Sequence, residues 1–224
     1  MMRRPKQGSS FVPLMSALYD QRNYKEALEQ ARDAQTKDPQ RWEAYAMCGK
    51  ALFSMKRYRD AGDSLRTAAS KAPQEQQAKL KDNATKADNE GQYQDLCLTA
   101  ATQLSQGQYG AAAALLNSAW KLFPERTQTG FDAASNAILA KDYNTARSIL
   151  QELAKVPSEA ATADSMLTKL NLLTTLSSKQ SEAASANPQP PPPLVPPESV
   201  DKEIGDLSKW YDEQKARPNF RQHQ

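Results

Sequence analysis

The sequence predicts an all-α fold assembled from repeated helical units, and two observations carry that prediction. The first is that residues of the same type recur at one spacing. A spacing of about 34 residues separates Tyr24 from Tyr58, Ala27 from Ala61, Ala34 from Ala68, and Pro39 from Pro73. The second is that each of these prolines closes an alanine-rich stretch that favours helix. A period of this length is typical of repeat proteins, in which neighbouring units stack and bury one continuous core.

The same spacing returns further along the chain. It separates Tyr109 from Tyr143, and each of these tyrosines is followed by an alanine three positions later and then by a proline. Tyr58 and Tyr109 are separated by one and a half periods. We therefore expect an insertion between the first and the second pair of units.

The clearest unit, residues 42–73, resembles a repeat of the tetratricopeptide repeat (TPR) family. The residues that carry the resemblance are Tyr45, Gly49, Leu52, Tyr58, Ala61, Leu65, Ala68 and Pro73. The family's unit is two antiparallel helices. In such a unit Gly49 and Ala61 are small because the two helices approach each other there, and Tyr58 fills the turn between them.

The resemblance covers residues 11–157 and implies a TPR-type α-solenoid with units at about 11–39, 42–73, 93–124 and 127–157. A capping helix is expected over residues 158–178, which would complete a solenoid domain at 11–180. Met166, Leu170, Leu173 and Leu176 recur there at three- and four-residue steps, as on a helix that covers the open edge of a stack. The same stripe would also suit a dimer face.

Residues 74–92 allow two interpretations. They extend the first helix of the third unit, or they form a separate polar helix, since Leu80 is the only large apolar residue of the stretch 74–81. The run Asp88-Asn89-Glu90-Gly91 resembles a break and slightly favours the separate helix.

The two ends differ from the solenoid in composition. Residues 1–10 are a polar, flexible leader with positive charge but no apolar segment after it, so we expect a cytoplasmic chain, or a periplasmic or secreted one if a signal peptide has been removed. Residues 181–197 are an Ala/Ser- and Pro-rich linker with seven prolines between Pro188 and Pro197, which favours a stiff polyproline II spacer over a ligand for an aromatic groove.

A short amphipathic helix is expected over residues 198–217, before a disordered end at 218–224. One stripe of it holds the apolar residues Val200, Ile204, Leu207 and Tyr211, and Trp210 adjoins the stripe. A helix of this length is marginal alone in water, so the stripe requires a partner surface. That surface is the groove of its own solenoid, the groove of another copy, or a different protein; a disordered tail is the remaining alternative.

Composition and motifs argue against catalysis. The chain has 224 residues, with 29 Lys and Arg against 26 Asp and Glu, which gives no electrostatic case for nucleic acid or an acidic membrane surface. Two cysteines and the single histidine, His223, leave almost no means of binding a metal. No phosphate-binding, nucleophile-elbow or dinucleotide motif occurs, and no apolar run is long enough to span a bilayer. We expect no enzyme, no cofactor and no metal.

The family resemblance implies that a ligand lies on the concave surface formed by the first helix of each unit. Carried over position by position, the groove residues are Val12, Ser16, Tyr19, Glu43, Ala46, Lys50, Phe53, Gln94, Cys97, Ala101, Leu104, Phe131, Ser135 and Ile138. Lys50 alone matches the lysine and asparagine clamp that some members use for a terminal carboxylate, so an apolar peptide or an amphipathic helix is the expected ligand. For Tyr19, Phe53 and Phe131, packing against the next unit is the alternative.

Two functions follow from this sequence. The first is an adaptor that binds a segment of another protein in the groove. The second is a structural or assembly subunit that docks, or self-associates, through its tail helix or capping helix. Trp120, Cys48 and Cys97 are expected to be core residues in either case.

Overall fold

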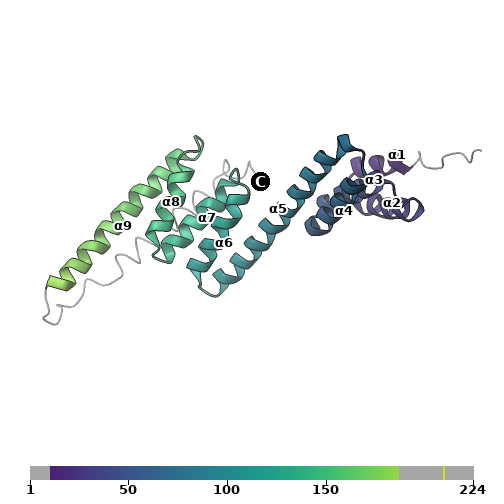
Figure 1. The fold of residues 1–224 in the computed structure, drawn as a ribbon. Helices are drawn as coiled ribbons and strands as arrows, with labels where there is room; N and C mark the ends of the chain where they lie inside the picture. The colour runs from purple at the N-terminus through teal and green to yellow at the C-terminus, as the bar shows by residue number, and fades with distance from the viewer. Residues whose placement is uncertain (1–10, 187–208, 210–224) are drawn as a thin grey trace, which may run out of the picture. The chain divides into compact units, whose positions relative to one another are not determined.

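The structure is a computed structural model that describes residues 11–186 and, beyond them, Lys209 alone. The described residues contain helices and turns and no strand (Figure 1). The helices of residues 11–186 are α1 (Phe11–Asp20), α2 (Tyr24–Lys37), α3 (Trp42–Ser54), α4 (Tyr58–Lys71), α5 (Gln74–Ser105), α6 (Tyr109–Leu122), α7 (Thr127–Leu139), α8 (Tyr143–Leu153) and α9 (Ala160–Ala186). The predictions for the leader, the proline run and most of the tail helix concern residues outside the described ones.

The chain divides into two compact units, Met1–Gln94 and Asp95–Gln224, and α5 crosses the boundary between them. In the first unit α1 packs on α2, α2 on α3, and α3 on α4. In the second unit α6 packs on α7, α7 on α8, and α8 on α9, and these four helices lie side by side in Figure 1. The all-α solenoid class is confirmed within each unit.

The period seen in the sequence is also present in the backbone. Each helix pair is joined by a short turn that contains one residue with positive φ: Arg22 (61°), Lys56 (60°), Gly107 (72°) and Lys141 (60°). After each of these residues, one backbone N–H donates to a carbonyl five positions earlier, as from Arg57 to Leu52 at 2.9 Å. This is the Schellman ending of a helix, which satisfies the last carbonyls and reverses the chain so that the next helix runs antiparallel.

The small residues of the repeat lie where the helices meet. Ala27, Ala61, Ala112 and Ala146, each three positions after the tyrosine of its unit, are fully buried. A Cβ built on Gly49 of α3 would lie 2.6 Å from Leu65 Cγ and 3.1 Å from the carbonyl oxygen of Ala61, both on α4. The absence of a side chain at Gly49 therefore sets how closely α3 and α4 approach.

Helix α5 runs through residues 88–91 without interruption, so the separate polar helix that this run favoured is wrong. Leu80, Ala84, Ala87 and Gly91 form one buried stripe at helical spacing. A Cβ built on Gly91 would lie 3.4 Å from Tyr58 Cβ, so the glycine permits close helix packing and does not mark a turn. Apart from Leu80, the stripe contains no large apolar residue, and a pattern of large apolar residues is therefore not visible in the sequence.

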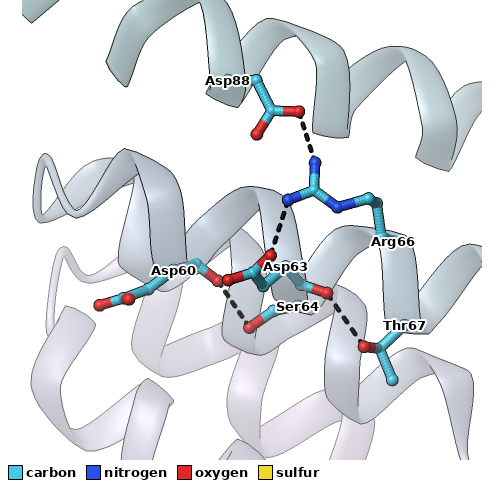
Figure 2. Close-up of polar contacts among 6 residues, drawn as sticks. All are labelled: Asp60, Asp63, Ser64, Arg66, Thr67 and Asp88. Carbon is cyan, nitrogen blue, oxygen red and sulfur yellow. Dashed lines mark hydrogen bonds and ion pairs between the residues drawn. The ribbon is translucent and has the colours of Figure 1, made fainter. Parts of the chain in front are cut away.

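Polar contacts also hold α5 against α4 in the first unit (Figure 2). Arg66 of α4 forms an ion pair with Asp88 of α5 and a second with Asp63, at 2.6 Å, on its own helix. The hydrogen bond to Asp63, assisted by Asp88 and opposed by burial, raises the pKa of Arg66. Gly62 lies beneath Asp88, and a Cβ built on it would collide with that carboxylate.

Helix α9 closes the second unit. Met166, Leu170 and Leu173 are buried in the same core as residues of α6, α7 and α8, as expected of a capping helix. Leu176 is 41% exposed, so it does not continue that buried stripe. The helix also extends beyond the expected end at 178 to Ala186, because the Ala-rich segment 181–186, assigned to the linker, favours helix.

Candidate functional site

The residues predicted to line the groove occupy equivalent places in the repeat. Three rows lie 12, 8 and 5 positions before the tyrosine that begins each second helix. The first row is Val12, Ala46, Cys97 and Phe131, the middle row is Ser16, Lys50, Ala101 and Ser135, and the third row is Tyr19, Phe53, Leu104 and Ile138. Glu43 and Gln94, one turn earlier, are half-buried and exposed respectively.

The middle row is the most accessible of the three. Lys50 and Ala101 are exposed, and Ser16 and Ser135 are half-buried. In the other two rows Val12, Tyr19, Phe53, Cys97 and Leu104 are half-buried. On α1 and α3, and on the part of α5 in the second unit, half-buried apolar side chains therefore lie beside the more accessible middle row.

Three of the predicted groove residues are core residues instead. Phe131 is 0% and Ile138 2% exposed, and both lie in the hydrophobic core of the second unit; Ala46 is buried in the core of the first. For Phe131 the packing alternative is thus the correct one. Helix α7 lies inside the stack of its unit, so its large side chains are enclosed by neighbouring helices and present no open surface.

One aromatic residue on α1 and one on α3 each pack against the tyrosine that begins the following helix. Tyr19 packs against Tyr24 with ring centroids 5.2 Å apart, and Phe53 packs against Tyr58 at 5.1 Å. Each pair joins the end of a first helix to the start of the second, and the two pairs lie one period apart in the sequence. The tyrosines of the turn therefore fix one side of each ring, while Tyr19 and Phe53 remain only half-buried.

A direct contact joins α1 and α3. The hydroxyl groups of Tyr19 and Ser54 are 2.8 Å apart, a hydrogen bond between the ends of the two first helices. The bond brings the ends of the two first helices together, and Tyr19 and Phe53 hold equivalent positions of the repeat on these helices. We call the surface formed by Val12, Ser16, Tyr19, Lys50 and Phe53 the α1–α3 face.

A second apolar surface lies on α5 in the second unit. Sequence reasoning found Cys97, Ala101 and Leu104 there but missed Leu98, which is 69% exposed. Leu98 lies one position beyond the first row, so the repeat pattern gave no reason to select it. We call Cys97, Leu98, Ala101 and Leu104 the α5 strip.

Trp120 and Cys48 are core residues, as expected, whereas Cys97 is not fully buried. Trp120 is buried, and its indole N–H donates to the carbonyl of Pro124 at 3.0 Å. Cys48 is buried, with the hydroxyl of Ser64 donating to its sulfur at 3.6 Å, whereas Cys97 is half-buried. Among the described residues, no group of three or more His, Cys, Asp or Glu side chains could hold a metal ion. None of the described helices is both long and apolar enough to cross a membrane.

A match to one family model supports the repeat assignment. A family model described as tetratricopeptide repeat matches residues 18–84 and 103–170. A search of curated proteins gave no match. Among solved structures, the TPR domain of P58(IPK) is similar, with 15% sequence identity over 92% of this chain and 73% of that one and a TM-score of 0.38.

Proposed function

Because this chain belongs to the tetratricopeptide repeat family, whose repeats are generally protein–protein interaction modules, we propose that it is a non-catalytic adaptor that binds an apolar peptide or an amphipathic helix on the α1–α3 face. The proposal rests on one observation above all. Tyr19 and Phe53, at equivalent positions of neighbouring first helices, each pack against a tyrosine ring and are only half-buried.

This arrangement favours binding for an entropic reason. A side chain that is already ordered loses little rotamer freedom when a ligand packs on it, so more of the contact energy appears as affinity. Tyr24 and Tyr58 supply that order, and the Tyr19–Ser54 hydrogen bond fixes the two first helices relative to each other. Aromatic side chains are also enriched among the residues that dominate binding energy in interfaces.

The charge of the face indicates what the ligand carries. Lys50 is its only charged residue, is exposed, and stands where Ser16 stands in the preceding unit. A solvent-exposed ion pair contributes roughly 0–1 kcal/mol, so Lys50 selects for an acidic group beside the apolar segment without supplying most of the affinity. A terminal-carboxylate clamp is not proposed, because Val12 and Ser16 stand where the clamp's remaining lysine and asparagine would be.

The test begins with the intact chain as bait and identification of the captured protein by mass spectrometry. The affinity of the identified segment is then measured for Phe53→Ala and Lys50→Ala, and for Lys56→Ala, an exposed lysine of the α3–α4 turn, as the matched control. We expect Phe53→Ala to weaken binding by about tenfold or more, Lys50→Ala by about fivefold or less, and Lys56→Ala not at all.

Two further measurements make the result decisive. Thermal melts must show that Phe53→Ala leaves the first unit folded, since its ring also packs on Tyr58. The variant Leu98→Asp reports on the α5 strip. If Leu98→Asp loses binding while Phe53→Ala keeps its affinity, the ligand binds the α5 strip and the α1–α3 face is refuted as the site.

The alternative, an assembly subunit that docks through α9 or through the tail, is favoured by the exposed Leu172 and Leu176 on α9. Deleting residues 187–224 separates the adaptor from a subunit that docks through the tail, and Leu172→Asp/Leu176→Asp separates it from one that docks through α9. An adaptor keeps its partner affinity after the deletion, whereas a subunit that docks through the tail loses association. Light-scattering mass measurement of the purified chain distinguishes a monomeric adaptor from a self-assembling subunit.

A further inference from the structure

Helix α9 carries an exposed apolar pair on the side that faces away from the core. Leu172 is 53% and Leu176 41% exposed, one turn apart on the same stripe, while Met166, Leu170 and Leu173 of the same helix are buried. We call Leu172 and Leu176 the α9 edge.

The position of α9 in the stack indicates what kind of surface this edge is. Helices α7 and α8 each pack on a helix to either side, whereas α9 packs on α8 and is the last helix of residues 11–186. The α9 edge therefore lies at the end of the stack, where a solenoid can accept one more helix.

We propose that residues 198–217 of the same chain dock on the α9 edge as that additional helix. These residues lie outside the described part of the chain except for Lys209, which is helical and exposed. The apolar stripe predicted for the segment has two residues at its centre, Ile204 and Leu207, which is the same number of apolar side chains as the α9 edge offers. Lys209 lies on the opposite side of such a helix, so its exposure agrees with this orientation.

The tether is long enough for docking within one chain. Residues 187–197 separate α9 from the segment, and 11 residues of polyproline II at about 3.1 Å each reach about 34 Å. Leu172 lies 14 residues before Ala186, a distance of about 21 Å along α9 at about 1.5 Å per residue. The segment can therefore reach the α9 edge without displacing any part of α9.

The size of the α9 edge favours a tethered segment over a second copy of the chain. With 53% and 41% of their surfaces exposed, the two leucines together offer about the area of one fully exposed leucine. A stable dimer buries roughly 800 Å² on each partner, which is far more than this edge provides. A tethered helix needs much less contact, because the linker holds its effective concentration in the millimolar range.

Charge adds complementarity at the rim of the edge. Lys179, one turn after Leu176, is exposed, and the first half of the segment contains Glu198, Asp201, Glu203 and Asp206. Opposite charges at a rim guide docking and select orientation more than they add affinity.

The test is hydrogen exchange of the full chain, read over residues 198–217. The variant is Leu172→Asp/Leu176→Asp, and the control is Thr175→Asp, an exposed residue of α9 that introduces the same kind of charge. We expect amide protection in the segment to be about fivefold or more higher in the wild type and in the control than in the double variant, since docking adds protection to a helix that is marginal alone.

A second readout reports on the segment directly. Trp210 is one of three tryptophans, so the difference between the wild-type and Trp210→Phe emission spectra isolates its fluorescence. We expect its emission to shift to the red, toward that of a solvated indole, in the double variant and to stay unchanged in the control. Melts should show that the second unit stays folded in the double variant, because both leucines are exposed.

Three outcomes would overturn the inference. The first is equal protection in the double variant and the wild type. The second is protection that falls on dilution, which would assign the segment to a neighbouring copy. The third is loss of protection in Phe53→Ala with the α9 variants unaffected, which would place the segment on the α1–α3 face. The inference does not depend on the proposed adaptor function, because it concerns a different surface of the chain.

Discussion

Replacing Gly49 with alanine tests directly whether close approach of α3 and α4 determines the geometry of the first unit. The new Cβ would lie 2.6 Å from Leu65 Cγ, 3.0 Å from Leu65 Cδ2 and 3.1 Å from the carbonyl oxygen of Ala61. Carbon atoms pack at about 3.5–4.0 Å, so the leucine must move by about 1 Å in a core where it is only 3% exposed.

Two effects of opposite sign decide the magnitude. Overpacking a core costs about 1–3 kcal/mol, whereas alanine in place of glycine inside a helix gains about 0.5–1 kcal/mol. We therefore expect Gly49→Ala to lower the free energy of unfolding by about 1–2 kcal/mol, measured by urea denaturation followed by circular dichroism.

A double-mutant cycle assigns this cost to the contact with Leu65. In a Leu65→Ala background the side chain that meets the new Cβ is absent, so Gly49→Ala should cost at least about 1 kcal/mol less than in the wild type. If the cost is the same in both backgrounds, or if Gly49→Ala stabilises the wild type, helix approach at Gly49 does not limit the packing and our explanation of the glycine is wrong.

Three further predictions address other parts of the chain. Gly107→Ala should destabilise the second unit by about 1–2 kcal/mol because φ is positive there, whereas Gly110→Ala, in a helix with only ordinary contacts, should be neutral or stabilising in the same urea titration. Asp142 caps α8 by accepting from the Thr145 amide at 3.1 Å, so Asp142→Ala should cost about 1 kcal/mol at pH 7 in thermal melts. The hydrogen bonds from Thr145 lower the pKa of Asp142, so the stability they add is present above the carboxyl's ordinary pKa and is lost as pH falls below about 4. The Asp142→Asn variant, which caps without titrating, should lose less stability than the wild type over that range, and parallel loss would contradict this. Deleting residues 187–224 should leave ligand affinity at the α1–α3 face unchanged and leave the oligomeric state unchanged by light scattering, since the uncovered α9 edge is much smaller than a stable dimer interface; lower affinity would contradict the separate location of the two surfaces, and new association would contradict the size argument.

Much of the fold could be predicted from the sequence because the residues that define each repeat lie close together in the chain. Each tyrosine marks the start of a second helix, each alanine three positions later is buried, and Gly49 lies at a close approach, as expected. These signals are local because one unit is a helix hairpin, whose contacts join residues close in sequence. The short turns follow the same period, although Lys56 and Lys141 adopt positive φ there without being glycine.

The candidate site was predicted less completely, and the reason lies in the stacking. The repeat assigned Phe131 and Ile138 to the same rows as Val12 and Tyr19, but α7 lies between other helices of its unit and its large side chains are enclosed. Leu98 was missed for the opposite reason, since its exposure depends on which neighbours α5 has and not on its place in the period.

The sequence alone determined the helix pairs, their register and the positions that face inward, because these depend on periodicity and on residue size. Only the tertiary structure decided which equivalent positions are open, that α5 continues through Asp88 and Gly91, and that Leu172 and Leu176 remain uncovered on the last helix of residues 11–186. The exposure of a side chain depends on which helices pack against it. In a stack of repeats, equivalent positions have different neighbouring helices at the ends and in the middle.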